Sequence, residues 1–210
     1  MKLHLGCGER YLEGYINIDY PPEEHTVQSK NVADIQCDLR KLHYEKGTVE
    51  EIRLHHVFEH FSRPVACALI TKWSEWLYRG GRLHIEVPDF DRTCLHIFNP
   101  FTSDKARKIG LRHLFGSQEA DWAVHYVGYG KKEICDLLRL NGFEIIKISR
   151  NHWGDTYNIE VIAEKKKELD LEIKAAGTRE YLKKYCVDES AGELKMLDVW
   201  MEMYKRQLYS

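Results

Sequence analysis

The stretch LHLGCGERYLEGYINID, residues 3–19, contains two short apolar segments separated by a glycine-rich turn. Residues 2–5 form an apolar run that is closed by Gly6, Cys7 and Gly8, which is typical of a buried strand followed by a sharp turn. Residues 15–19 alternate apolar and polar side chains before a Pro-Pro pair, so they predict a second strand. Because glycine has no Cβ, such a turn lets the backbone approach a ligand closely. The stretch therefore predicts the ligand-binding edge of an open sheet.

This turn differs in spacing from a dinucleotide-binding fingerprint. A third glycine would fall at position 11, where the sequence has Tyr11. The acidic residue Asp19 follows Gly8 by 11 residues, whereas the fingerprint places its acid about 20 residues on. The helix between the first two strands can then have only about one turn. It would offer a pyrophosphate few of the backbone N–H groups that usually bind it. We therefore expect a nucleoside ligand without phosphates.

The rest of the first 165 residues alternates between strand and helix patterns. Further strands are expected at residues 33–37, 51–57, 82–87, 143–148 and 157–163. Helices are expected at residues 65–77, with Gly80-Gly81 ending the first, and at 131–140. This alternation predicts an α/β fold with a Rossmann-like, doubly wound, mostly parallel sheet.

Two segments fall outside the alternation. Residues 91–130 are rich in aromatic side chains and histidine, and so long a connection predicts a lid or substrate wall with some helix of its own. The chain after the expected domain of residues 1–165 forms a helical extension, residues 166–210, with an apolar stripe at helical spacing. The stripe consists of Leu194, Leu197, Met201, Tyr204 and Leu208. Its partner is either the chain's own domain or a second subunit in a homodimer, and both remain open.

The composition narrows the classes of function. The chain has 210 residues, a net charge of −2 and no run of apolar residues long enough for a membrane span, so we expect no membrane partner and no nucleic-acid partner. The six cysteines include no C-x-x-C pair, which argues against a zinc knuckle or a redox dithiol. The N-terminal residues lack the pattern of a secretory signal, so a cytoplasmic protein is expected.

Two aspartates follow expected strands in order behind the glycine turn. Asp19 ends the second strand, where a carboxylate can accept hydrogen bonds from both hydroxyls of a ribose. Asp38 follows the third strand, where it can accept from an adenine amino group while Leu39 contacts the ring. A single aspartate after a strand more often caps a turn, but the ordered pair favours a nucleoside site.

These motifs together resemble a known family. The stretches LHLGCGERYLEGYINID, CDLRKL, HHVFEHF and YRGGRLHIEVPDF are similar to those of class I S-adenosylmethionine-dependent methyltransferases, in particular the small branch often associated with polysaccharide and other glycan biosynthesis. The resemblance covers residues 2–163 and implies a seven-stranded sheet with an antiparallel last strand and S-adenosylmethionine as cofactor. It implies that Gly6, Cys7 and Gly8 border the methionine part of the cofactor, Asp19 its ribose, and Asp38 with Leu39 its adenine.

The segment HHVFEHF, residues 55–61, has two incompatible interpretations. On a helix, His56-x-x-Glu59-His60 would be the motif of an inverted zinc peptidase. After a strand, it would form the polar edge of the methyl-transfer site. The alternation of residues 52–57 and the position of Pro64 favour the strand, so we expect no metal ligands here.

On this interpretation, residues 56–60 lie beside the sulfonium. His56 then contributes to the cofactor site, and His60 is the first candidate for a general base because the pKa of histidine is near neutrality. His125 is the second candidate, and Glu59 is expected to orient a neighbour or the cofactor's amino group. Trp122, Tyr126 and Tyr129 are expected to form a stacking wall or to pack the lid.

The sequence thus predicts an enzyme that transfers a methyl group from S-adenosylmethionine to a small hydroxylated acceptor. The resemblance points to a sugar, or its activated or phosphorylated precursor. The competing hypothesis is a non-catalytic subunit of the same fold that binds S-adenosylmethionine and acts in regulation or assembly.

Overall fold

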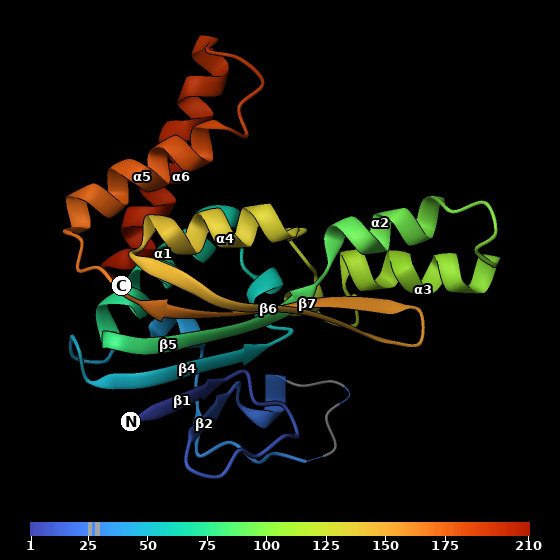
Figure 1. Ribbon diagram of the computed structural model, residues 1–210, viewed down its shortest axis with the longest axis horizontal. Coiled ribbons are helices and arrows are strands. Elements are labelled where there is room, and N and C mark those ends of the chain that lie inside the picture. Colours follow the sequence, from blue (N-terminus) through green and yellow to red (C-terminus); the bar gives the residue numbers. More distant parts are fainter. Residues whose placement is uncertain (25–26, 28–29) are drawn as a thin grey trace.

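The computed structural model describes residues 1–24, 27 and 30–210. Within these residues, seven strands form one sheet in the order β3-β2-β1-β4-β5-β7-β6 (Figure 1). The strands are β1 (Lys2–Leu5), β2 (Ile16–Asp19), β3 (Ile35–Gln36), β4 (Val49–His55), β5 (Leu77–Pro88), β6 (Phe143–Trp153) and β7 (Thr156–Lys165). The predicted Rossmann-like α/β fold is confirmed.

Strand direction fixes where a ligand can bind. Strands β1 to β5 pair in parallel, whereas β7 runs antiparallel to both β5 and β6. The chain order reverses between β1 and β4, which are neighbours in the sheet. Loops at the carboxyl ends of parallel strands diverge at such a reversal and leave a crevice. The predicted antiparallel last strand is therefore present, and the crevice beside β1 and β4 is where a binding site is expected.

The helices lie over the middle of the sheet and near its two ends (Figure 1). The α-helices are α1 (Arg63–Trp76), α2 (Phe90–Phe98), α3 (Asp104–Phe115), α4 (Lys131–Leu140), α5 (Leu171–Lys183) and α6 (Ala191–Leu208). Short 3-10 helices are η1 (Pro22–Glu24), η2 (Leu39–Lys41), η3 (Phe58–His60) and η4 (Asp121–Ala123). In Figure 1, α1 and α4 lie over the middle of the sheet, α2 and α3 lie beside the far end of the β6–β7 hairpin, and α5 and α6 extend from the opposite end. The insert thus contains helices of its own, as predicted.

The end of α1 corrects one prediction. The helix ends at Trp76, and β5 begins at the next residue, so Gly80 and Gly81 lie inside a strand and do not cap the helix. Gly80 has a φ of +96°. A Cβ on Gly81 would lie 2.9 Å from the carbonyl oxygen of Tyr78 and 3.1 Å from that of Glu50. Gly81 is needed because its backbone passes close to other backbone atoms, and Gly80 is needed because of its positive φ.

Several strand predictions are wrong in their bounds. Strands β5 and β6 are longer than the expected 82–87 and 143–148, and two other strands end before the expected residue. The third strand, expected at residues 33–37, is reduced to Ile35 and Gln36, both of which are exposed, so it has little apolar surface to bury. The fourth strand, expected at 51–57, ends at His55 because His56 has a φ of +53°, which extended backbone cannot have.

The C-terminal stripe packs inside its own chain. Helix α6 lies against α1, and Leu197, Met201 and Tyr204 are buried there. The Tyr204 hydroxyl lies 3.1 Å from Oγ1 of Thr71 on α1. The apolar partner of this stripe is therefore α1. Among the described residues, no helix has the length and apolar character needed to cross a bilayer.

Candidate active site

A cavity of about 1130 Å³ lies at the crevice beside β1 and β4. Its walls come from the ends of four parallel strands and from the insert. The predicted cofactor residues Gly6, Cys7, Gly8, Asp19, Asp38, Leu39 and His56 all line it, together with His60. The structure thus brings these separately predicted residues to one hollow.

The glycine turn after β1 forms the floor of this cavity. Gly6 and Gly8 have φ angles of +66° and +55°, which L-residues with a Cβ rarely adopt. The N–H of Gly6 donates to the carbonyl of Ile18 over 2.8 Å, which ties the turn to β2. A Cβ on Gly6 would overlap Cγ2 of Val57, whereas a Cβ on Gly8 would meet open space. Gly6 is therefore needed for packing as well as conformation, and Gly8 leaves room for a ligand.

Asp19 sits at the carboxyl end of β2 with 7% of its surface exposed. Its Oδ2 accepts a hydrogen bond from the N–H of Gly8 over 2.5 Å, and its Oδ1 accepts one from the N–H of Tyr20 over 2.8 Å. A carboxylate oxygen can accept more than one hydrogen bond. Asp19 therefore holds the glycine turn in place and still presents a carboxylate to the cavity.

Asp38 belongs to a charged pair at the start of η2. Its Oδ1 accepts from the N–H of Arg40 over 2.9 Å, and the Arg40 guanidinium donates to both of its oxygens. Burial acts to raise the pKa of Asp38, but the hydrogen bonds and charge of Arg40 outweigh it and lower that pKa. The carboxylate is thus ionised and oriented, and Leu39 beside it is buried at 6% exposure.

Cys7 lines the same cavity between the two glycines. Burial, followed by the charge of Asp19, raises the pKa of this thiol to about 12. A thiol is a nucleophile only as the thiolate. Cys7 is therefore a neutral wall of the cavity near pH 7.

The segment after β4 is the polar edge of a sheet and not a metallopeptidase helix. His56 follows the strand in a left-handed conformation, and only residues 58–60 turn, as η3. Its Nδ1 lies 3.3 Å from Oε1 of Glu59, and its Nε2 lies 3.5 Å from Oε1 of Glu86. Burial acts to lower the pKa of His56, but these two carboxylates raise it to about 10. His56 is thus a cation held between two acids.

Glu59 is the most buried of the candidate catalytic residues. It is 1% exposed, and neither of its carboxylate oxygens has a hydrogen-bond partner within the described residues. Burial raises its pKa, but the neighbouring histidines, His56 first, outweigh burial and lower it. Glu59 does not line the cavity, and its Oε1 lies near His56 and His125.

His60 and His125 lie side by side, although they are far apart in the sequence. Their ring centroids are 4.6 Å apart. Nδ1 of His60 lies 3.2 Å from the carbonyl oxygen of Val124, and Nδ1 of His125 lies 3.1 Å from that of His113. Because a carbonyl oxygen only accepts, each Nδ1 carries a proton, and in the neutral ring this leaves the lone pair on Nε2. His60 lines the cavity, whereas His125 does not.

The aromatic side chains of the insert divide into two groups. Trp122 and Tyr126 line the cavity, and the indole N–H of Trp122 donates to the carbonyl of Glu24 on η1 over 2.7 Å. Tyr129 is 2% exposed and stacks on Phe58 with ring centroids 5.0 Å apart. Tyr129 is therefore part of the core, and the predicted stacking wall is reduced to Trp122 and Tyr126.

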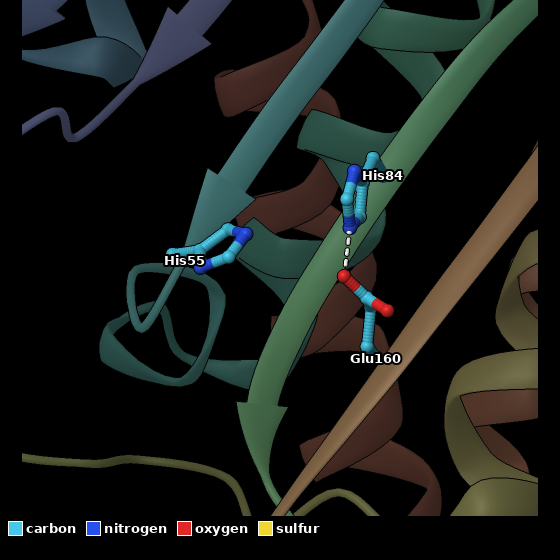
Figure 2. Close-up of side chains that lie close together, drawn as sticks. All are labelled: His55, His84 and Glu160. Atoms are coloured by element: carbon cyan, nitrogen blue, oxygen red, sulfur yellow. Dashed lines mark hydrogen bonds and ion pairs between the residues drawn. The ribbon is translucent and has the colours of Figure 1, made fainter. Parts of the chain in front are cut away.

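A second histidine and carboxylate group was not predicted. His55, His84 and Glu160 project from three neighbouring strands, β4, β5 and β7 (Figure 2). Nε2 of His84 lies 2.5 Å from Oε1 of Glu160, and Oε2 of Glu160 accepts from the hydroxyl of Ser149 over 2.5 Å. Only the strand register brings these residues together, so spacing along the chain could not have found them.

Comparisons with known proteins agree on the architecture. No protein-family model matches the chain, and no curated protein matches it by sequence. Solved structures do match, including a methyltransferase from Methanosarcina mazei described as SAM-dependent, with 17% identity, a TM-score of 0.53, and coverage of 80% of this chain and 92% of that chain.

Two other solved structures carry the same architecture. One is the 1,6-didemethyltoxoflavin-N1-methyltransferase of Burkholderia thailandensis with bound S-adenosylhomocysteine, at 14% identity, a TM-score of 0.51, and coverage of 79% and 71% of the two chains. The other belongs to a complex between the Haloferax volcanii Trm112 methyltransferase activator and a methyltransferase, at 11% identity, a TM-score of 0.54, and coverage of 80% and 83%. The chain therefore has the class I fold of S-adenosylmethionine-dependent methyltransferases.

Proposed function

We propose that this protein is a methyltransferase that uses S-adenosylmethionine and acts on a small hydroxylated acceptor. The observation that carries the proposal is the meeting of Gly8, Asp19 and Asp38 at one cavity, at the point where the strand order reverses. The fold supports the cofactor, since the similar structures are methyltransferases of this class.

The residues around the cavity fit an adenosyl ligand. Gly8 leaves open space where a Cβ would stand, and Asp19 is a buried carboxylate that can accept from ribose hydroxyls. We assign Asp38 to an adenine amino group, Leu39 to the ring face, and Gly6 with Cys7 to the methionine part. When bound, S-adenosylmethionine supplies an electrophilic methyl group on a sulfonium.

We assign the acceptor to the part of the cavity lined by His60, Trp122 and Tyr126. The cavity of about 1130 Å³ exceeds the roughly 300–1000 Å³ of common small-molecule sites, so it has room for an acceptor beside the cofactor. Two aromatic rings offer flat apolar faces, which suits the stacking of a sugar ring. We propose a sugar or its activated precursor in glycan synthesis as the acceptor, with Glu59, His60 and His125 activating its hydroxyl.

The proposal is tested by calorimetric titration of the purified protein with S-adenosylmethionine and, separately, with NAD. We expect binding of S-adenosylmethionine and weak or no binding of NAD, because the turn lacks the third glycine of a dinucleotide site. Tighter binding of NAD would overturn the proposal. A panel of sugars and sugar nucleotides with a radiolabelled methyl donor then tests the acceptor. Cofactor binding without methylation of any acceptor would favour a non-catalytic subunit instead.

A further inference from the structure

The carboxylate of Glu59 is buried among imidazoles. Both of its oxygens are hidden from solvent and have no hydrogen-bond partner among the described residues. Its Oε1 forms an ion pair with the His56 cation, whose Nδ1 lies 3.3 Å away, and lies 3.9 Å from Nε2 of His125, which is beyond hydrogen-bond distance. A buried carboxylate without hydrogen bonds is costly unless a cation pairs with it. His56 is such a cation and pairs with Oε1, whereas Oε2 has no hydrogen-bond partner among the described residues and can still accept one.

The two histidines beside Glu59 are oriented as metal ligands usually are. Nδ1 of His60 donates to the carbonyl of Val124, and Nδ1 of His125 donates to that of His113. A metal-bound histidine commonly donates its second ring N–H to a carbonyl or carboxylate, which fixes the ring and its tautomer. Here both carbonyl partners of Nδ1 are in place. In the neutral rings, Nε2 of His60 and Nε2 of His125 can each coordinate a metal ion.

We propose that Glu59, His60 and His125 bind one divalent transition-metal ion, with Zn²⁺ as the best match. One potential ligand atom from each of these residues lies within 4.8 Å of the others. Tetrahedral zinc with bonds of about 2.0–2.1 Å needs its ligand atoms roughly 3.3 Å apart, so these atoms have to approach one another by up to about 1.5 Å. Two imidazoles and a carboxylate form a set that suits Zn²⁺ or Fe²⁺ and not Mg²⁺ or Ca²⁺.

The other histidine and carboxylate group lacks these properties. In His55, His84 and Glu160, the carboxylate already accepts from His84 and Ser149, and Figure 2 shows His84 turned onto Glu160. Nε2 of His55 accepts from Arg53 over 2.9 Å. The side chains of this group already bind one another or their neighbours in the chain. The group therefore serves as a matched control and not as a second metal site.

The ion has a consequence for the proposed reaction, and this part rests on the proposed function. Of the three ligands, His60 lines the cavity beside Trp122 and Tyr126. Three protein ligands leave a fourth position of a tetrahedral ion open, as in catalytic zinc sites. A hydroxyl that coordinates such an ion becomes more acidic. The same site would thus prepare a hydroxyl group of the acceptor for methylation.

The site is tested by titrating the full chain, stripped with EDTA, with Co²⁺ and following the visible d–d bands. We expect one equivalent of Co²⁺ to give the intense bands of a tetrahedral site, and Zn²⁺ to displace it. Glu59→Gln and His125→Asn should each weaken binding by at least roughly 100-fold, since even loss of an outer partner costs 10- to 100-fold. Glu160→Gln should bind as the unchanged protein does.

Controls separate a ligand role from a folding defect. Circular dichroism of each variant checks the fold, and His60→Asn provides a third ligand change at a partly exposed position. Absence of tetrahedral bands, equal binding by Glu59→Gln that has folded, or loss of binding in Glu160→Gln would overturn the proposal. Titration with S-adenosylmethionine is a separate readout. Metal binding without cofactor binding would refute the proposed function and leave the metal site standing, and the reverse result would refute only the metal site.

Discussion

The backbone N–H of Gly8 donates a 2.5 Å hydrogen bond to Oδ2 of Asp19. This bond joins the turn after β1 to the carboxyl end of β2, so the floor and one wall of the cavity are a single unit. The acid that we assign to the ribose is also the acid that orients the turn. Changes at either residue should therefore affect the binding of the same ligand.

Replacing Asp19 by alanine should weaken the binding of S-adenosylmethionine by about 1.5–3 kcal/mol, because charge-assisted hydrogen bonds are lost. This corresponds to roughly 10- to 150-fold in the dissociation constant measured by calorimetry. Asp34→Ala is the control, since it removes the same charge near β2 from a residue that does not line the cavity. Equal affinity of Asp19→Ala and the unchanged protein would mean that this carboxylate does not contact the ligand.

Replacing His60 by alanine should lower the turnover number at saturating S-adenosylmethionine by on the order of 100-fold, because the group that activates the acceptor is lost. The affinity for S-adenosylmethionine should change little, because we assign His60 to the acceptor end of the cavity. His152→Ala, at an exposed position of β6, should leave both quantities unchanged. A His60→Ala variant with normal turnover would remove His60 from the reaction.

Gly6→Ala should destabilise the protein more than Gly8→Ala. Both positions have positive φ, which costs an L-residue roughly 1–2 kcal/mol. Only at Gly6 does the new methyl group overlap Val57, which adds about 1–3 kcal/mol for overpacking. Urea unfolding of Gly6→Ala, alone and combined with Val57→Ala, measures the contribution of this overlap to the loss of stability. If removing the valine methyls restores none of the lost stability, overlap is not the cause.

The free energy of unfolding should fall between pH 6.5 and pH 4 partly because of His55. Burial, supported by Arg53 and opposed by Glu86, lowers the pKa of His55 from 6.5 to about 4. Below pH 6.5 the unfolded chain binds a proton that the folded protein binds only near pH 4, so acid favours unfolding. The loss is on the order of 2 kcal/mol, given partial exposure of the ring.

Unfolding measured across this range checks that prediction. His55→Gln should lose less stability than the unchanged protein between pH 6.5 and pH 4, whereas His43→Gln, at an exposed position, should keep the original slope. Parallel curves for His55→Gln and the unchanged protein would assign the acid sensitivity to other groups.

Tyr204→Phe should reduce the free energy of unfolding by about 1 kcal/mol, because the contact between its hydroxyl and Thr71 joins α6 to α1 in the core. Tyr209→Phe is the matched control, since Tyr209 is 74% exposed. Urea unfolding measures both. An unchanged stability of Tyr204→Phe would mean that this contact contributes nothing to the packing of α6.

The sequence predicted correctly those elements whose bounds are set by residues close together in the chain. Helix α4 begins and ends where the sequence predicts, because its apolar stripe and the Asn141-Gly142 end are both local signals. The predicted end of β4 was wrong because His56 leaves the strand and lies between Glu59 and Glu86. Glu86 lies on a neighbouring strand, so no local pattern could reveal this contact. The end of α1 was predicted within one residue, but the capping role given to Gly80-Gly81 was wrong, because Gly81 is required by a close backbone approach to Glu50 and not by a helix cap.

The site was predictable where strand ends define it. Asp19 and Asp38 line one cavity, as the sequence predicted, because parallel strands deliver their carboxyl ends to one edge of the sheet. The contact of Glu59 and His60 with His125 depends on the path of the insert, which no periodicity records. The sequence therefore suggested three catalytic candidates separately but gave no sign that they form one cluster.

The hydrogen bond from Trp122 to the carbonyl of Glu24 has a kinetic consequence. It joins the segment after β2 to the insert, and both segments line the same cavity, so these two walls can separate only if this bond breaks. Such opening steps often limit turnover when the chemical step is fast.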